Sequence, residues 1–251
     1  MAHRDEIIQY LDAYMNAAEF TDYLPVGLLV EGRTTVHKVA AAVSASREIF
    51  EQAAEWGADM LLVHHGIFWD GESPVLKGFK KDRVKMLLDS EITLIGYHLP
   101  LDAHPEVGNN ILFAQAMGWK NIEAFGSYKG KKIGFKGECE KQSAQDFLKD
   151  AQAFYGTEPT AFLDGPAEIR SAAVISGGAW DHIQEAAEEG IDCFVTGNSD
   201  EPVYNMAREM KIHFLAFGHY ATERVGIRKL AEHIGEKFQL TTRFFDVDNP
   251  L

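Results

Sequence analysis

Side chains that commonly bind metal ions gather in three short stretches of the sequence. In chain order the stretches contain His64 and His65, then His98, Asp102 and His104, then His219 and Glu223. Mixed imidazole and carboxylate ligands suit Zn, Fe or Mn better than Mg or Ca. A catalytic zinc ion needs only three protein ligands, so a set of this size fits two divalent ions that share a bridging carboxylate. The expected ligands are His64, His65, Asp102, His219 and Glu223, with Glu223 as the bridge.

The two adjacent histidines end an apolar strand pattern, "DMLLVHH", at 59–65. Successive side chains of a regular strand point to opposite faces, so His64 and His65 cannot both be ligands within one. They can if the chain leaves the strand at this point, and Gly66 permits such a turn. The alternative is one buried histidine bonded to a carbonyl group and one exposed histidine.

The other two stretches follow further strand patterns. Pro100 lies between His98 and Asp102 and disfavours a helix interior, so we expect a loop to hold them. Alternatively, Asp102 caps a turn. His219 and Glu223 are four residues apart at a helix start, on one face of its first turn, where the helix dipole also favours an acidic residue. Because ligands of open α/β sheets bind beyond the carboxyl ends of the strands, the three stretches together favour a metal site.

Four more residues could support these ligands. His98 could be a sixth ligand or could orient one, and His104 is a weaker candidate for the same role. Thr196 and Asn198 lie where a sequence repeat places the counterpart of the His-His strand end. We expect them to line the same crevice.

The elements that would position these residues alternate between strands and helices. We expect helices at 4–18, 46–57, 79–90, 106–117, 142–154 and 220–236, and strands at 26–32, 37–44, 59–65 and 92–98. This alternation indicates βαβ units, so the expected fold class is α/β with mostly parallel sheets. The Gly- and Lys-rich segment 122–139 instead predicts antiparallel strands, and "LTTRFFDVDNP" predicts a terminal edge strand.

The second half of the chain repeats the first. "AAAVSASREIFEQAAEWGADMLLVHHG" corresponds to "SAAVISGGAWDHIQEAAEEGIDCFVTGN", with a constant offset of 133 that relates Asp59 to Asp192. In both halves the next segment runs from a helix into a strand followed by a histidine. We therefore expect two similar α/β lobes, one over 1–124 and one over 125–251, the second beginning with the antiparallel segment.

Composition narrows the class of protein. Of 251 residues, 46% are hydrophobic, enough to bury a sizeable core. The net charge of -14 would repel a phosphate backbone, so nucleic-acid binding is not expected. A local exception would be a basic lining formed by Lys129, Lys131, Lys132 and Lys136. No apolar run approaches the ~20 residues of a membrane span, and the N-terminus is unlike a signal peptide, so we expect a cytoplasmic protein.

Six blocks of sequence follow one another in a distinctive order. They are "GLLVEG", "LLVHHGIFWDGESPVLKG", "YHLPLDAHPEVGNN", "VTGNSDEPVYNMARE", "GHYATERVGIRKL" and "FFDVDNP". In this order they resemble the GTP cyclohydrolase 1 type 2 homologue family, also called YbgI-like dinuclear metal-centre proteins, over nearly the whole chain. The resemblance implies two α/β lobes with the metal pair in the cleft between them, and a ring-shaped homohexamer. It also implies ligands at His64, His65, Asp102, His219 and Glu223.

The chain departs from the family pattern at several positions beside these blocks. The family usually has polar or imidazole side chains where this chain has Val26, Leu29, Asn198, Tyr204 and Tyr220. Close relatives tend to have Glu or Asp at the position of Asn198. The five ligands are unchanged, so the departures bear on substrate chemistry rather than on metal binding.

Two hypotheses of different classes follow. The first is a metal-dependent hydrolase in which a metal-bound water attacks a polarised carbon or phosphorus, with Asp102 and Glu223 as candidate catalytic groups. The family name implies opening of the purine ring of GTP, but another nucleotide, a phosphoester, an amide or a cyclic amidine fits equally. The alternative is a non-enzymatic role in metal handling or as a regulatory scaffold.

Overall fold

The computed structural model describes residues 1–251 and divides into two compact units. Unit 1 contains Met1–Leu101 and Gly226–Asp248, and unit 2 contains Asp102–Val225 and Asn249–Leu251. The sequence repeat suggests two continuous halves, whereas these units are discontinuous. The reason is that the C-terminal strand pairs with a strand from the start of the chain, so the end of the chain belongs to unit 1.

Unit 1 is built on a five-stranded sheet in the order β13-β4-β5-β6-β2. These strands are β2 (Gly27–Val30), β4 (Lys38–Ser44), β5 (Met60–His65), β6 (Thr93–Gly96) and β13 (Thr241–Phe244). All neighbours are parallel except β2, which runs antiparallel to β6. The predicted terminal strand, β13, does lie at an edge. A separate antiparallel pair joins β1 (Ala2–His3) to β3 (Thr35–Val36).

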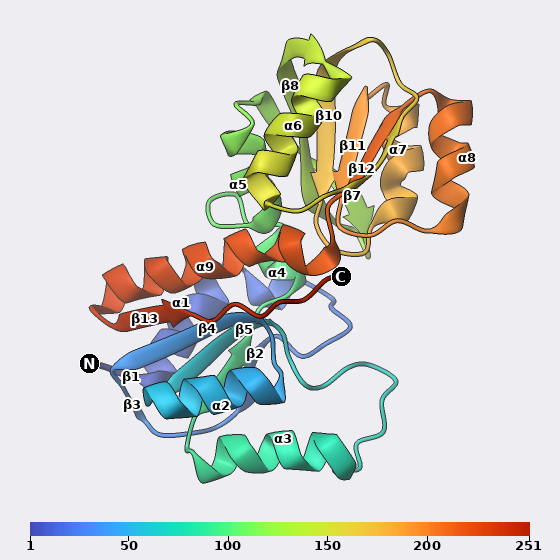
Figure 1. Ribbon diagram of the computed structural model, residues 1–251. Helices are drawn as coiled ribbons and strands as arrows, with labels where there is room; N and C mark the ends of the chain where they lie inside the picture. The colour runs from blue at the N-terminus through green and yellow to red at the C-terminus, as the bar shows by residue number, and fades with distance from the viewer. The chain divides into compact units, whose positions relative to one another are not determined.

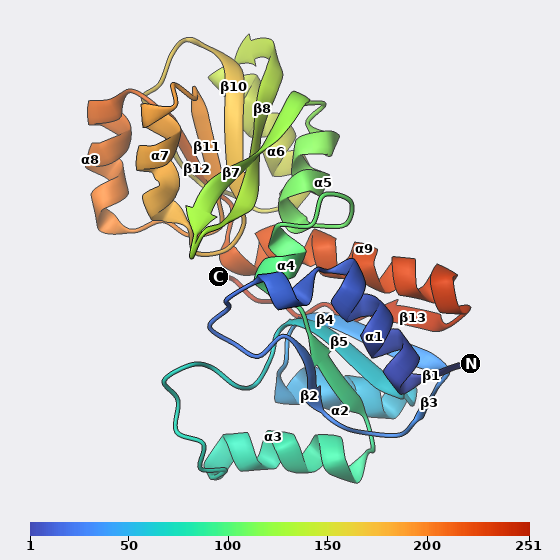
Figure 2. The same ribbon diagram turned by 180° about the vertical axis from the view of Figure 1, so that it is seen from behind.

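Helices cover both faces of this sheet. They are α1 (Arg4–Tyr14), α2 (Arg47–Trp56), α3 (Gly78–Asp89) and most of α9 (His219–Phe238), with a short 3-10 helix, η1 (Ala17–Glu19). Figures 1 and 2 show α2 and α3 on one face and α1 and α9 on the other. On the first face, Ile49, Phe50 and Leu87 pack against Leu61 and Val63 of β5 in a dry core. Burial of this apolar surface is the main force that holds the layers together.

Unit 2 is built on a six-stranded sheet in the order β7-β8-β10-β11-β12-β9. The strands are β7 (Lys120–Tyr128), β8 (Lys131–Ser143), β9 (Thr160–Leu163), β10 (Glu168–Ile175), β11 (Cys193–Thr196) and β12 (His213–Ala216). The three strands β10, β11 and β12 are parallel, β8 and β9 run antiparallel to their neighbours β10 and β12, and β7 runs antiparallel to β8. β7 and β8 form the hairpin that the segment 122–139 predicts.

The helices of unit 2 also form two layers. They are α5 (Asn109–Ala116), α6 (Ala144–Tyr155), α7 (Ile183–Glu188) and α8 (Glu201–Met210), with the 3-10 helix η2 (Trp180–His182) before α7. α7 and α8 lie on one face of the sheet, and α5 and α6 on the other (Figure 2). Under α5 and α6, Phe113, Phe147 and Tyr155 pack against Val174 and Val195 of the sheet.

The internal repeat is visible in the topology. In unit 1 the order β4-α2-β5-α3-β6 gives three adjacent parallel strands, and in unit 2 the order β10-α7-β11-α8-β12 gives the same arrangement. Parallel strands need crossover connections, and a helix supplies each of them here. The predicted fold class, α/β with two similar lobes, is confirmed.

One local prediction is wrong. Pro100 suggests that a loop holds His98 and Asp102, but Leu99–Asp102 forms a short helix, α4. Proline has no backbone N–H. It is tolerated in the first turn of a helix, because N–H groups there have no acceptor within the helix. Asp102 is the last residue of α4, at the point where the chain passes from unit 1 into unit 2.

Two general properties of the chain concern cysteine chemistry and membranes. Cys139 and Cys193 are both free thiols. Burial, with the nearby carboxylate of Asp192, raises the pKa of Cys139 to about 12, so its thiolate is scarce near neutral pH. None of the helices combines the length and the apolar character that crossing a membrane requires.

Candidate metal centre

Three histidine rings of unit 1 lie together at the carboxyl ends of β5 and β6. The ring centroids of His64 and His65 are 4.7 Å apart, those of His64 and His98 are 4.8 Å apart, and those of His65 and His98 are 5.4 Å apart. One ring nitrogen from each histidine lies within 4.8 Å of the other two. Three imidazole nitrogens at this spacing can converge on one metal ion, because each bond needs about 2.0–2.1 Å.

The adjacent histidines reach the same place because β5 loses one neighbour at its end. β5 pairs with β6 only as far as Val63 opposite Gly96, whereas its pairing with β4 continues to Ser44 opposite His65. His64 therefore lies beyond the β6 ladder, and its ring can turn toward that of His65. His64 is fully buried and contacts a carbonyl group, as the alternative expected, but His65 is partly buried rather than exposed.

Hydrogen bonds within unit 1 orient the first two rings. Nδ1 of His64 lies 3.0 Å from the carbonyl oxygen of Tyr97. A carbonyl only accepts, so Nδ1 carries the proton and the lone pair of the neutral ring is on Nε2. Nδ1 of His65 lies 3.0 Å from Oγ of Ser44, a hydroxyl that can act as donor or acceptor. The His64 tautomer is the one that a metal ligand bound through Nε2 requires.

His98 is held by a buried carboxylate that the sequence pattern does not reveal. Nδ1 of His98 lies 2.9 Å from Oδ1 of Asp22, whose other oxygen accepts the N–H of Leu99 at 3.0 Å. Burial favours the neutral form of Asp22, but the hydrogen bonds from His98 and the backbone outweigh it and lower the pKa of this carboxyl. Asp22 lies in a loop without any periodic pattern, so nothing in the sequence connects it to His98, 76 residues away.

In unit 2 the predicted i, i+4 pair lies at the start of α9. Nε2 of His219 is 3.2 Å from Oε1 of Glu223. The Glu223 side chain is 2% exposed and that of His219 is 33% exposed. Gly177 permits this arrangement: its φ is +68°, and a Cβ at this position would lie 2.4 Å from Oε1 of Glu223. The turn after β10 therefore leaves room for the Glu223 carboxylate.

Asp102 is held in unit 2 by three polar side chains. Oδ1 of Asp102 accepts hydrogen bonds from Nδ2 of Asn109 and Oγ of Ser176, both at 2.8 Å. Nδ2 of Asn110 donates to the Asp102 carbonyl at 3.2 Å, and Oδ1 of Asn110 accepts the N–H of Ser176 at 2.7 Å. Asp102 is 5% exposed. It contacts the same Ser176-Gly177 turn that accommodates Glu223.

The three weaker candidates have mainly local roles. Nδ1 of His104 accepts the N–H groups of Glu106 and Val107, both at 3.2 Å, so His104 caps the turn before α5. Thr196 is buried and its hydroxyl donates to the carbonyl of Gly177 at 3.3 Å. Asn198 is exposed, and its backbone N–H donates to the same carbonyl at 2.9 Å.

Among the departures from the family pattern, Leu29 packs beside the glycines at the ends of β5 and β6. Its Cδ1 would be 2.5 Å from a Cβ at Gly66 and 3.1 Å from one at Gly96. These two glycines flank the ends of β5 and β6, so Leu29 places an apolar side chain beside the imidazole cluster. Tyr204, by contrast, is 47% exposed and packs against Phe162.

Comparison with known proteins agrees with this fold along the whole chain. The family model of Duf34/NIF3 (NGG1p interacting factor 3) matches residues 2–250. The chain is 42% identical over 247 residues to the GTP cyclohydrolase 1 type 2 homolog of Chlamydia trachomatis serovar D, and the match covers 98% of each protein.

Solved structures give the same result. The chain is 40% identical to protein ybgI, described as of unknown function, with a TM-score of 0.92 and coverage of 99% of this chain and 100% of that one. It is 33% identical to a protein from Thermus thermophilus, with a TM-score of 0.91 and the same coverage. These relatives are similar to the chain in both fold and sequence.

Proposed function

The chain belongs to the Duf34/NIF3 family, and on that premise we propose that it holds two divalent metal ions and hydrolyses a small molecule with them. The observation that carries the proposal is the set of three imidazoles, from His64, His65 and His98, whose nitrogens lie within 4.8 Å of one another. Their donor chemistry fits Zn, Fe or Mn.

The proposed ligands are those that the sequence predicts. They are His64, His65, Asp102, His219 and Glu223. Two carboxylates offset much of the charge of two divalent ions, and a buried carboxylate such as Glu223 is well suited to bridge them. His98 is either a sixth ligand or a group that orients the others, and its hydrogen bond to Asp22 suits both roles.

The chain itself would contribute binding, orientation and exclusion of water. Divalent ions at such a site act as Lewis acids and make a bound water more acidic. Hydrogen bonds from Asn109 and Ser176 hold the Asp102 carboxylate in a fixed orientation for binding. Leu29 beside the histidines lowers the local polarity and strengthens electrostatic contacts there. The substrate is a nucleotide, a phosphoester or a cyclic amidine in this proposal.

A second candidate function is metal handling or a regulatory scaffold without catalysis. The same ligand set serves it, because tight binding needs no open coordination position. The Leu29 and Asn198 departures favour this candidate, since Leu29 replaces a polar side chain that the family usually has and Asn198 replaces a carboxylate with a neutral amide.

The first experiment is metal analysis of purified protein. Wild type is expected to hold about two divalent ions per chain, and His64→Ala and Glu223→Ala are expected to hold fewer. His37→Ala is the matched control, because His37 is exposed and outside every cluster. Equal metal content in all four proteins would contradict the ligand assignment.

Turnover separates the two candidate functions. Metal-loaded wild type would be incubated with GTP, a set of phosphoesters and a cyclic amidine, and the release of product would be measured. Turnover that disappears in Glu223→Ala supports the hydrolase. Full metal content without turnover on any substrate supports metal handling.

A further inference from the structure

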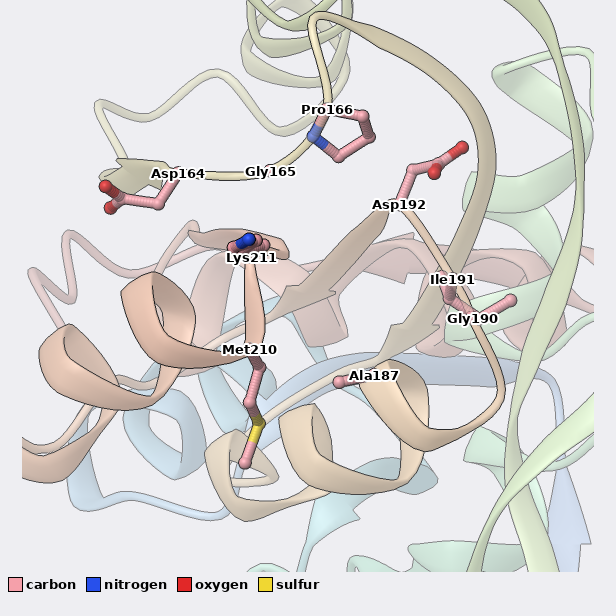
Figure 3. Close-up of a pocket in the computed structure, with 9 residues that line it drawn as sticks. All are labelled: Asp164, Gly165, Pro166, Ala187, Gly190, Ile191, Asp192, Met210 and Lys211. Atoms are coloured by element: carbon pink, nitrogen blue, oxygen red, sulfur yellow. The ribbon is translucent and has the colours of Figure 1, made fainter.

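A hollow of about 360 Å³ lies in unit 2 at the amino ends of β11 and β12. Its walls include Asp164, Gly165, Pro166, Asp192, Met210 and Lys211 (Figure 3). We call it the Asp192 hollow. It lies at the opposite ends of the strands from the predicted metal ligands, so it is independent of the proposed function.

The internal repeat supplies a counterpart of Asp192 in unit 1. Oδ2 of Asp192 accepts the backbone N–H groups of residues 170 and 171, at 2.8 and 3.0 Å. Oδ2 of Asp59 accepts those of residues 37 and 38, also at 2.8 and 3.0 Å. All three pairs of positions differ by the same offset of 133. The two aspartates therefore occupy equivalent places and use one oxygen in the same way.

The equivalence extends to the loop beside each aspartate. In unit 1 the N–H of Gly32 donates to the side chain of the first residue of β6, at 3.1 Å. In unit 2 the N–H of Gly165 donates to the side chain of the first residue of β12, at 3.3 Å. The two glycines again differ by 133 positions. The next residue is Arg33 in unit 1 and Pro166 in unit 2.

Arg33 uses the second oxygen of Asp59. Its Nη1 donates to Oδ1 of Asp59 at 3.2 Å, and its Nη2 donates to the carbonyl of Ser90 at 3.0 Å. Nη2 also lies 3.8 Å from a carboxylate oxygen of Glu91. The guanidinium thus joins the aspartate to the end of the preceding helix, α3, as its planar fork of donors allows.

Unit 2 has the acceptors of this arrangement without the cation. Pro166 has no guanidinium and no N–H, and Oδ1 of Asp192 accepts no hydrogen bond from the chain. Met210 and Lys211 end α8 where Ser90 and Glu91 follow α3, and both line the hollow. Asp164 adds a second carboxylate to the walls, and this carboxylate already lies 3.7 Å from Nε of Arg208.

We propose that the Asp192 hollow binds a guanidinium group, in the place that Arg33 fills in unit 1. The group would donate to Oδ1 of Asp192 and to the free carbonyl at the end of α8. A planar cation with several donors matches two acceptors on different elements better than an ammonium does. Its source is either a small guanidino compound or an arginine side chain of a partner protein.

The test uses N-acetyl-arginine amide as the probe and ligand-observed NMR titration of the full-length protein. N-acetyl-citrulline amide is the control ligand, because it has nearly the same shape and no charge. Wild type is expected to bind the arginine probe with a millimolar dissociation constant, at least tenfold more tightly than the citrulline probe. No saturable preference for arginine would overturn the proposal.

Two variants test whether the probe binds in the Asp192 hollow. Pro166→Arg supplies the missing guanidinium from the chain itself, so it should weaken probe binding at least tenfold. Lys211→Glu restores the acidic residue of unit 1 and should tighten binding about twofold to fivefold. Lys149→Glu, an equal charge change on exposed α6, is the control and should leave affinity unchanged. Equal affinity in wild type and both hollow variants would overturn the proposal.

A third arm distinguishes the source of the guanidinium. Methylguanidinium and the blocked peptide Gly-Arg-Gly would be titrated side by side. Tighter binding of the peptide indicates an arginine side chain of a partner, and equal or tighter binding of methylguanidinium indicates a free guanidino compound.

Discussion

Gly177 is the residue that brings the carboxylate of Glu223 against the turn after β10. Its φ of +68° is unfavourable for other residues, and the space that a Cβ would occupy is taken by Oε1 of Glu223 at 2.4 Å and Nε2 of His219 at 3.1 Å. Two proposed metal ligands thus depend on a residue that is not itself a ligand.

Gly177→Ala is therefore expected to lower metal affinity as well as stability. The left-handed backbone costs alanine roughly 1–2 kcal/mol, and the methyl group would displace the carboxylate. Gly156→Ala is a matched control, because Gly156 has a φ of +74° with nothing within 4 Å of its Cβ position. Both variants should lose stability in urea unfolding, but only Gly177→Ala should lose metal by elemental analysis. Equal metal content in the two variants would contradict this role for Gly177.

At the residue scale the sequence points to candidate ligands more readily than to the residues that orient them. His64, His65, His219 and Glu223 are recognisable because their chemistry and spacing are unusual. Asp22 is not, because its contact with His98 depends on how a patternless loop crosses the end of β6. Long-range hydrogen bonds of this kind follow from the fold and cannot be derived from local spacing.

The elements themselves begin and end where local chemistry dictates. Ser46 precedes α2 with extended backbone, and its hydroxyl accepts the N–H of Ile49 at 3.3 Å. Gly57 ends the helix with a φ of 73°, the left-handed conformation that glycine adopts at low cost. α2 packs against β5, the strand that carries His64 and His65. The stability of α2 therefore helps to hold this strand in place.

Ser46→Ala is expected to destabilise unit 1 by about 1 kcal/mol, because one N–H of the first helical turn loses its acceptor. Ser46→Gly should cost only a few tenths of a kcal/mol, since glycine leaves room for water to replace the hydroxyl. Urea unfolding with an unchanged m-value is the measurement. An equal loss in both variants would mean that the hydroxyl contributes nothing as a cap.

The sequence predicts which segments are helices and which are strands. It does not predict where some helices begin, or the short helix at Pro100. The periodic helices and apolar strands occur as expected because each local preference agrees with burial. The helix expected at 106–117 begins only at Asn109, since residues before it form a turn capped by His104. The helix α4 is not predicted, because proline usually ends or interrupts a helix. Pro100 is compatible with α4 only because the helix starts one residue earlier, at Leu99.

At the scale of the whole molecule, the net charge disfavours nucleic acid as a partner. Two of the four lysines that could have formed a basic lining on the β7–β8 hairpin form ion pairs within unit 2. Lys132 pairs with Glu185 at 2.7 Å, and Lys136 pairs with Glu189 at 2.8 Å. With a net charge of -14, the surface that remains offers little to a phosphate backbone.

The same charge makes the predicted homohexamer sensitive to salt. Six chains of 28.0 kDa would give an assembly of about 168 kDa. Each chain brings the same negative charge, so repulsion between copies weakens as salt shortens the Debye length from about 30 Å at 0.01 M to about 8 Å at 0.15 M. Apolar contacts between copies do not weaken in this way. Val75, Leu76 and Phe79 are exposed and available for such contacts.

Sedimentation velocity at low and moderate salt is the measurement. The hexamer should dominate at about 0.15 M salt and above, and any dissociation should occur at low salt. The opposite trend would mean that ion pairs rather than apolar surface join the copies. A single species of 28.0 kDa at every salt concentration would contradict the hexamer itself, and any ligand set would then have to be complete within one chain.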